Sequence, residues 1–139
     1  MRPAIVDTGP LVAFFDRAEQ HHLWVTEQIE ELDPPLLLCE AVLAETMYLL
    51  GRFPKAQEEL FGLLEKDALR IAFRIEEHLA ALRKLHQKYR DRPMSLADAC
   101  VVRMAELHEQ HAVLTLDSDF TVYRKHGRVS LALIHPALR

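Results

Sequence analysis

Two patterns of apolar positions alternate along this chain. Short continuous apolar runs are typical of strands buried on both faces of a parallel sheet, and longer stretches with apolar residues three and four apart are typical of helices. The short runs predict strands at 3–6, 36–38, 69–73, 112–115 and 129–134. The longer stretches predict helices at 8–15, 22–32, 40–50, 55–66, 76–89 and 96–108, with a short helical segment near 120–123.

Strands that alternate with helices indicate the α/β class, and specifically a three-layer α/β/α sandwich with a central, mostly parallel sheet. The chain has 139 residues, half of them apolar, which is enough for a real hydrophobic core. Because the sequence contains no linker, low-complexity tract or internal repeat, we expect residues 1–139 to form a single domain.

Composition indicates which partners the protein can bind and in which compartment it acts. With 17 basic and 21 acidic residues, the chain has no global basic field of the kind that announces a nucleic-acid binder, although basic residues can still cluster locally. Cys39 and Cys100 have apolar neighbours and no metal-ligand spacing, so we expect buried free thiols. Asp7 interrupts the first apolar run, and no stretch approaches about 20 apolar residues. We therefore expect a cytoplasmic protein with no membrane association.

Four carboxylates stand at positions where a charge is unusual. Asp7 and Asp117 follow the first and fourth predicted strands, and the ligand crevice of an open α/β sheet lies outside the carboxyl ends of its strands. Glu45 and Asp98 are in register with apolar positions of their helices, and we expect both on buried faces. The apolar positions are Ala41, Val42, Tyr48 and Leu49 for Glu45, and Val101, Val102 and Ala105 for Asp98.

Each acid also has a purely structural interpretation. Asp7 is well placed to cap the following helix, and the segment that begins at Asp117 has the composition of an ordinary turn. Glu45 and Asp98 could each form an ion pair with a nearby arginine such as Arg52 or Arg103. The sequence by itself leaves these alternatives open.

Gathering the four acids in one cleft would have an electrostatic consequence. Two carboxylates about 4 Å apart repel each other by roughly 4 kcal/mol at an effective dielectric constant near 20, so a cluster must raise some pKa values or recruit a cation. Oxygen ligands favour Mg²⁺ or Mn²⁺, and no His or Cys pair near these acids has the spacing of a zinc site. Such a site suits phosphoryl transfer to water.

The four acids lie in segments that together resemble the PIN-domain nucleases, in particular the VapC-type toxins of bacterial and archaeal toxin–antitoxin pairs. The resemblance covers essentially the whole chain. The order and spacing of four segments carry the resemblance. The segments are Ile5-Val6-Asp7-Thr8-Gly9-Pro10-Leu11, Val42-Leu43-Ala44-Glu45-Thr46, Leu96-Ala97-Asp98-Ala99 and Leu114-Thr115-Leu116-Asp117-Ser118-Asp119-Phe120.

The resemblance implies an Mg²⁺- or Mn²⁺-dependent endoribonuclease that hydrolyses RNA to leave a 3′-hydroxyl and a 5′-phosphate. Its metal would be held by Asp7, Asp98 and Asp117, and Glu45 would bind it through water or position the attacking water. It also implies a homodimer and a cognate antitoxin. Three further residues would support the acids. Asp119 would be a supporting acid or a structural partner, Thr115 would orient Asp117, and Thr8 or the backbone amides beside it would help to hold Asp7.

One position departs from the pattern of similar proteins. Ser95 occupies the variable position of the stretch Pro93-Met94-Ser95-Leu96-Ala97-Asp98, where relatives often carry another aspartate. Losing that negative charge would weaken the binding of a second metal ion, so the sequence leaves open whether the site holds one metal ion or two.

Three rival interpretations remain at this stage. Asp7-Thr8-Gly9 also matches the active-site triplet of aspartic proteases, but Pro10 follows where a small residue is usual and the chain is too rich in helix. A non-catalytic PIN-like interaction module would keep the fold and the acids while acting through a partner. A DNA-directed nuclease is the third, because nothing in the sequence recognisably reads the 2′-hydroxyl of RNA.

Overall fold

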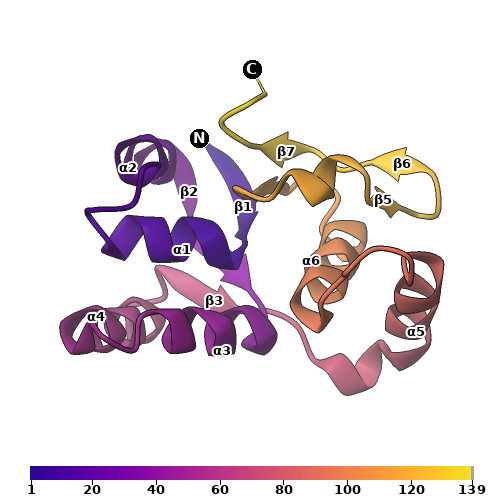
Figure 1. Ribbon diagram of the computed structural model, residues 1–139, viewed down its shortest axis with the longest axis horizontal. Helices are drawn as coiled ribbons and strands as arrows, with labels where there is room; N and C mark the ends of the chain where they lie inside the picture. The colour runs from indigo at the N-terminus through magenta and orange to yellow at the C-terminus, as the bar shows by residue number, and fades with distance from the viewer. Residues whose placement is uncertain (139) are drawn as a thin grey trace.

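Five parallel strands form the central sheet of the computed structural model, which describes residues 1–138 (Figure 1). Their order across the sheet is β3-β2-β1-β4-β7, so the first strand lies at the centre. The strands are β1 (Arg2–Val6), β2 (Leu32–Leu38), β3 (Leu69–Ile71), β4 (Ala112–Leu114) and β7 (Leu133–Ile134). A separate antiparallel pair consists of β5 (Arg124–Lys125) and β6 (Val129–Ser130).

Helices cover both faces of the sheet and complete a three-layer α/β/α sandwich. Figure 1 shows helices α1 to α4 on one side of the sheet and α5 and α6 on the other, as right-handed crossovers require when the chain reverses its direction across a sheet. The helices are α1 (Thr8–Phe15), α2 (His22–Glu30), α3 (Glu40–Leu49), α4 (Pro54–Glu65), α5 (Leu79–Lys88) and α6 (Leu96–Leu107), with short 3₁₀ helices η1 (Ile75–Glu77) and η2 (Ser118–Thr121).

The core forms where the central strands meet α6. Every residue of β4 is buried, as are the last three residues of β1, which explains why both strands are continuous apolar runs in the sequence. Helix α6 packs on them through residues that are buried along most of its length. A rigid core therefore supports the carboxyl ends of β1 and β4.

The predicted fold class and the order of the elements are confirmed, while two segments differ from the prediction. The expected strand at 129–134 is two short strands: β6 pairs with β5, and β7 joins the main sheet. The β5–β6 turn contains His126 and Gly127 with left-handed backbone angles (φ 52° and 82°), which the apolar pattern does not reveal. The segment 32–35, expected to end a helix and form a loop, instead belongs to β2.

The prolines of β2 are compatible with a strand at that place. A proline has no backbone N–H to donate to the sheet, and it is tolerated in a strand at irregularities. The pairing of β1 with β2 shifts register there, from Pro3 opposite Asp33 to Ile5 opposite Leu37. Strand β3 pairs only with the part of β2 that begins at Leu36.

Two further expectations can be compared with the structure. Cys39 and Cys100 are buried free thiols, as predicted. Among the described residues, no helix has both the length and the apolar character needed to cross a membrane.

Candidate active site

The candidate active site lies at the carboxyl edge of the sheet, between β1 and β4. From β1 the sheet continues through β2 and β3 in one direction and through β4 and β7 in the other, so β1 and β4 flank the topological switch point. Open α/β sheets bind ligands outside the strand ends at this point. Asp7 directly follows β1, and Asp117 follows β4 after a short connection.

The structure brings all four predicted acids to one cleft of about 440 Å³, lined by Asp7, Glu45, Asp98 and Asp117 together with Thr8, Gly9, Pro93, Ser95 and Leu116. A groove against α5 and α6 is larger, at about 620 Å³. The convergence of four carboxylates from four separate segments, rather than size, therefore distinguishes the cleft.

Asp7 is the most deeply buried of these acids, with 6% of its surface exposed. It occupies the N-cap position of α1, but its side chain makes no capping hydrogen bond. Instead, the hydroxyl of Thr115 donates to Asp7 Oδ2 over 2.8 Å. Helix capping therefore does not explain this carboxylate, whose orientation is set by the residue that directly follows β4.

Asp117 has both a structural contact and a place in the cleft. Its Oδ1 accepts a hydrogen bond of 2.8 Å from the backbone N–H of Asp119, so the turn that its sequence predicts is present. The hydroxyl of Thr115 accepts from the backbone N–H of Asp117 over 3.0 Å. Thr115 thus contacts the backbone of Asp117, as a residue expected to orient it should, but the carboxylate that it holds belongs to Asp7.

Glu45 lies on an exposed part of α3, so the prediction that it belongs to the buried face is wrong. The buried face of the helix is formed by Val42 and Thr46, whereas Tyr48, which the prediction placed beside Glu45, is 84% exposed. The hydroxyl of Thr8 donates to Glu45 Oε1 over 2.8 Å. The hydroxyl of Thr8 therefore holds Glu45 rather than Asp7.

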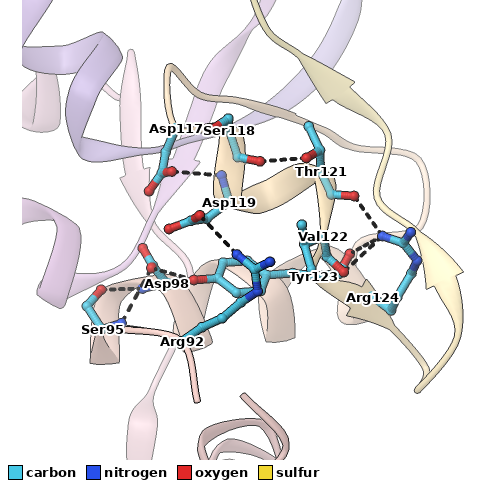
Figure 2. Close-up of polar contacts among 10 residues, drawn as sticks. All are labelled: Arg92, Ser95, Asp98, Asp117, Ser118, Asp119, Thr121, Val122, Tyr123 and Arg124. Carbon is cyan, nitrogen blue, oxygen red and sulfur yellow. Dashed lines mark hydrogen bonds and ion pairs between the residues drawn. The ribbon is translucent and has the colours of Figure 1, made fainter. Parts of the chain in front are cut away.

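Asp98 is half-buried in the first turn of α6 (Figure 2). Its Oδ2 accepts hydrogen bonds from the hydroxyl of Tyr123 at 3.0 Å and from the backbone N–H of Ser95 at 3.4 Å. The hydroxyl of Ser95 accepts from the backbone N–H of Asp98, which completes a capping box. Ser95 is thus the N-cap of α6 and also lines the cleft.

Asp119 does not line the cleft with the four acids. Its carboxylate pairs with the guanidinium of Arg92 at 3.4 Å, and Figure 2 shows this pair beside Asp98 and Asp117. Of its two expected roles, the contacts of Asp119 fit that of a structural partner.

The ion-pair interpretation of Glu45 and Asp98 is excluded. Arg103 pairs with Glu106 at 3.0 Å, and Arg52 stacks over the ring of Phe53. None of the ion pairs between residues 1 and 138 includes a carboxylate of the cleft. The cleft therefore gathers negative charge that no protein cation neutralises.

Burial and the neighbouring negative charges raise the pKa values of two acids of the cleft, Asp7 and Asp98. Burial, followed by repulsion from Asp98 and Asp117, raises the pKa of Asp7 to about 6, against the opposing influence of the Thr8 amide and the Thr115 hydroxyl. Burial and the charge of Asp117 also raise the pKa of Asp98, which hydrogen bonds from Tyr123 and Ser95 oppose. The pKa of Tyr123 itself is raised, chiefly by burial and then by Asp98, so its hydroxyl keeps its proton and remains a donor.

The raised pKa of Asp7 predicts that metal-free protein loses stability as the pH rises. The folded state binds this proton more tightly than the unfolded state, whose pKa is 3.8, so the free energy of unfolding falls between about pH 4 and pH 6 and levels off above. The full loss is about 3 kcal/mol. Urea unfolding in EDTA, compared between wild type and Asp7→Asn across this range, measures it. A difference between the two proteins that does not change with pH would contradict the assignment.

The carboxylates fit a hard divalent cation, although they do not already enclose one. In the part of the chain that the structure describes, no three His, Cys, Asp or Glu side chains stand close enough to hold a metal ion. Mg²⁺ commonly keeps several waters and takes only one or two carboxylates directly, so an open acidic cleft suits it. Asp7 provides the test of fit, because a buried carboxylate beside two other acids is stabilised by a cation.

The fold and the cleft together define the class of protein: a parallel α/β domain with an unneutralised carboxylate cluster at its topological switch point. The chain belongs to the PIN domain family, whose sequence profile matches residues 4–126. It is 32% identical to Ribonuclease VapC26 of Mycobacterium tuberculosis over 115 residues, which span 81% of this chain and 85% of that protein. Its fold is also similar to that of a chain in a toxin–antitoxin complex from Klebsiella pneumoniae. That match has a TM-score of 0.64 and 20% identity, and it covers 84% of this chain and 89% of the other.

Sequence reasoning missed Tyr123. The residue lies 25 positions from its partner Asp98, and nothing in its local pattern distinguishes it from a core aromatic residue. The only available signal was its place shortly after the segment that carries Asp117.

Proposed function

We propose that this protein is a divalent-metal-dependent endoribonuclease and the toxin of a toxin–antitoxin pair, acting as a single domain in the cytoplasm. The observation that carries the proposal is the cleft at the switch point, where four carboxylates gather without a protein cation. Membership of the PIN domain family supports it, as does the similarity to a protein named as a ribonuclease. The similarity in fold to a chain from a toxin–antitoxin complex accords with an antitoxin partner.

In this proposal Asp7, Asp98 and Asp117 hold Mg²⁺ or Mn²⁺. When bound, the cation supplies positive charge to the phosphodiester and assists the ionisation of water. Each of the three acids presents a carboxylate that is already oriented by a donor from the protein: Thr115 for Asp7, Tyr123 for Asp98 and the amide of Asp119 for Asp117. Such orientation limits the rearrangement that ligand binding requires.

Glu45 has a different environment and a different proposed role. It is exposed at the rim of the cleft, and the only hydrogen bond to its carboxylate from the described residues comes from the hydroxyl of Thr8. A carboxylate in this position can orient water and accept a proton from it. Attack of that water on phosphorus, with departure of the 3′ oxygen, gives a 5′-phosphate and a 3′-hydroxyl.

Cleavage of an end-labelled, structured RNA by purified protein tests the proposal. We expect cleavage with Mn²⁺ or Mg²⁺, none in EDTA, and restoration when the cation is returned in excess. DNA of the same sequence, assayed in parallel, separates an RNA-directed from a DNA-directed nuclease. Folded protein that cleaves neither substrate with either cation would favour the interaction module, and cleavage that persists in EDTA would contradict a metal-dependent mechanism.

A further inference from the structure

Tyr123 is a buried side chain that contacts Asp98, one of the acids of the cleft, from the interior of the protein. It lies just after η2, between the segment that carries Asp117 and the strand β5. None of its surface is exposed, yet its hydroxyl donates to Asp98 Oδ2 at 3.0 Å. Figure 2 shows the phenol directed at the Asp98 carboxylate from the side of that group away from Ser95.

The ring of Tyr123 is fixed by aromatic neighbours. Its centroid lies 5.2 Å from that of Phe120, with the two rings nearly perpendicular, and 5.0 Å from that of Tyr89. Edge-to-face contacts of this kind hold a ring in one orientation. The hydroxyl of Tyr123 is therefore delivered to Asp98 by a rigid platform rather than by a mobile side chain.

The hydrogen bonds leave one oxygen of Asp98 available. Oδ2 accepts from both Tyr123 and the amide of Ser95, whereas Oδ1 has no donor among residues 1–138. A carboxylate held through one oxygen cannot rotate freely, so its other oxygen keeps a fixed direction. Partners that orient a ligating side chain in this way strongly influence the affinity of metal sites.

We propose that Tyr123 is a positioning residue that fixes Asp98 for binding of a divalent cation in the cleft. This inference rests on the proposed function for the role of the cleft, but it concerns a residue that contacts neither cation nor RNA. Tyr123 acts through Asp98 alone. A phenylalanine would fill the same aromatic platform equally well, so the hydroxyl is the part of the side chain with this role.

Titration of metal-free protein with Mn²⁺, followed by calorimetry, tests the inference without any cleavage assay. We expect Tyr123→Phe to raise the dissociation constant about tenfold, at the lower end of the effect typical for residues that orient a ligand. The matched control is Tyr89→Phe. Tyr89 is also buried in the aromatic cluster, but its hydroxyl accepts from the backbone N–H of Arg124. This control loses a buried hydroxyl, and with it a hydrogen bond, away from the cleft and should bind Mn²⁺ like wild type.

A double-mutant cycle separates a positioning role from a general effect on folding. In the Asp98→Asn background, Tyr123→Phe should change Mn²⁺ affinity by less than about twofold, because the carboxylate through which it acts is absent. A further tenfold loss in that background would overturn the inference, as would wild-type affinity in the single variant. In either case, binding of Mn²⁺ by wild type would leave the proposed function standing. Wild-type protein that binds no Mn²⁺ would overturn both.

Discussion

Replacing Asp7 with asparagine is expected to lower the rate of RNA cleavage about 1,000-fold while the protein stays folded. The metal contributes several kcal/mol to transition-state stabilisation, and each 1.36 kcal/mol corresponds to a factor of ten in rate. Asparagine keeps the size of the side chain and an oxygen that can accept from Thr115, whose hydroxyl bonds Asp7 Oδ2. Single-turnover cleavage with Mn²⁺ measures the rate, and circular dichroism verifies the fold.

The separation of activity from stability makes this variant informative. Asp7 is buried and its pKa is raised to about 6, so removing its charge should stabilise metal-free protein at neutral pH even as it removes a proposed metal ligand. Asp33→Asn is the matched control, because Asp33 is exposed on β2. If the Asp7 variant kept more than about a tenth of wild-type activity, the proposed ligand set would be wrong.

Replacing Thr115 with valine is expected to lower both activity and stability. Thr115 is fully buried, and its hydroxyl joins Asp7 to the backbone of Asp117. Valine keeps the branched shape but removes the hydroxyl donor of the buried Asp7 carboxylate and the acceptor of the Asp117 backbone N–H. We expect a loss of about 1–3 kcal/mol in the free energy of unfolding and a roughly 10- to 100-fold fall in cleavage rate and Mn²⁺ affinity.

The control for Thr115 lies a few residues along the chain. Thr121 also donates a hydroxyl hydrogen bond, in this case to the carbonyl of Ser118, but it is exposed. Thr121→Val should therefore leave stability, Mn²⁺ affinity and cleavage close to wild type. A Thr115 variant that loses stability but binds Mn²⁺ and cleaves RNA like wild type would show that its hydroxyl only supports the fold.

The sequence was a good guide wherever burial on both faces produced a continuous apolar run. Strands β1 and β4 are such runs, and their carboxyl ends located Asp7 and Asp117. It was a poor guide where backbone geometry decided the structure. The left-handed residues His126 and Gly127 form the turn that pairs Val129–Ser130 with β5, so only Leu133–Ile134 of the last predicted strand joins the main sheet. The shift of register opposite Pro3 lets β2 begin earlier than its prolines suggested.

Prediction of the site was limited in the same way. Glu45 was chosen for a buried position that it does not have, because apolar residues on a helix need not face the core. Thr115 was expected to act on Asp117, and its contact with Asp7 spans 108 positions in sequence. The hydroxyl that Tyr123 directs at Asp98 likewise depends on packing between distant segments. Residue type and spacing identified the acids, but only tertiary structure shows what holds them.

The central place of β1 in the sheet has a consequence for the synthesis of this protein on the ribosome. Its neighbour β4 begins at Ala112. During translation Asp7 is therefore synthesised long before β4 and Asp117, which complete the cleft. No fragment still waiting for Asp117 to emerge from the ribosome can assemble the four-carboxylate cleft. The cell that translates this message is therefore not exposed to a finished centre until most of the chain has left the exit tunnel.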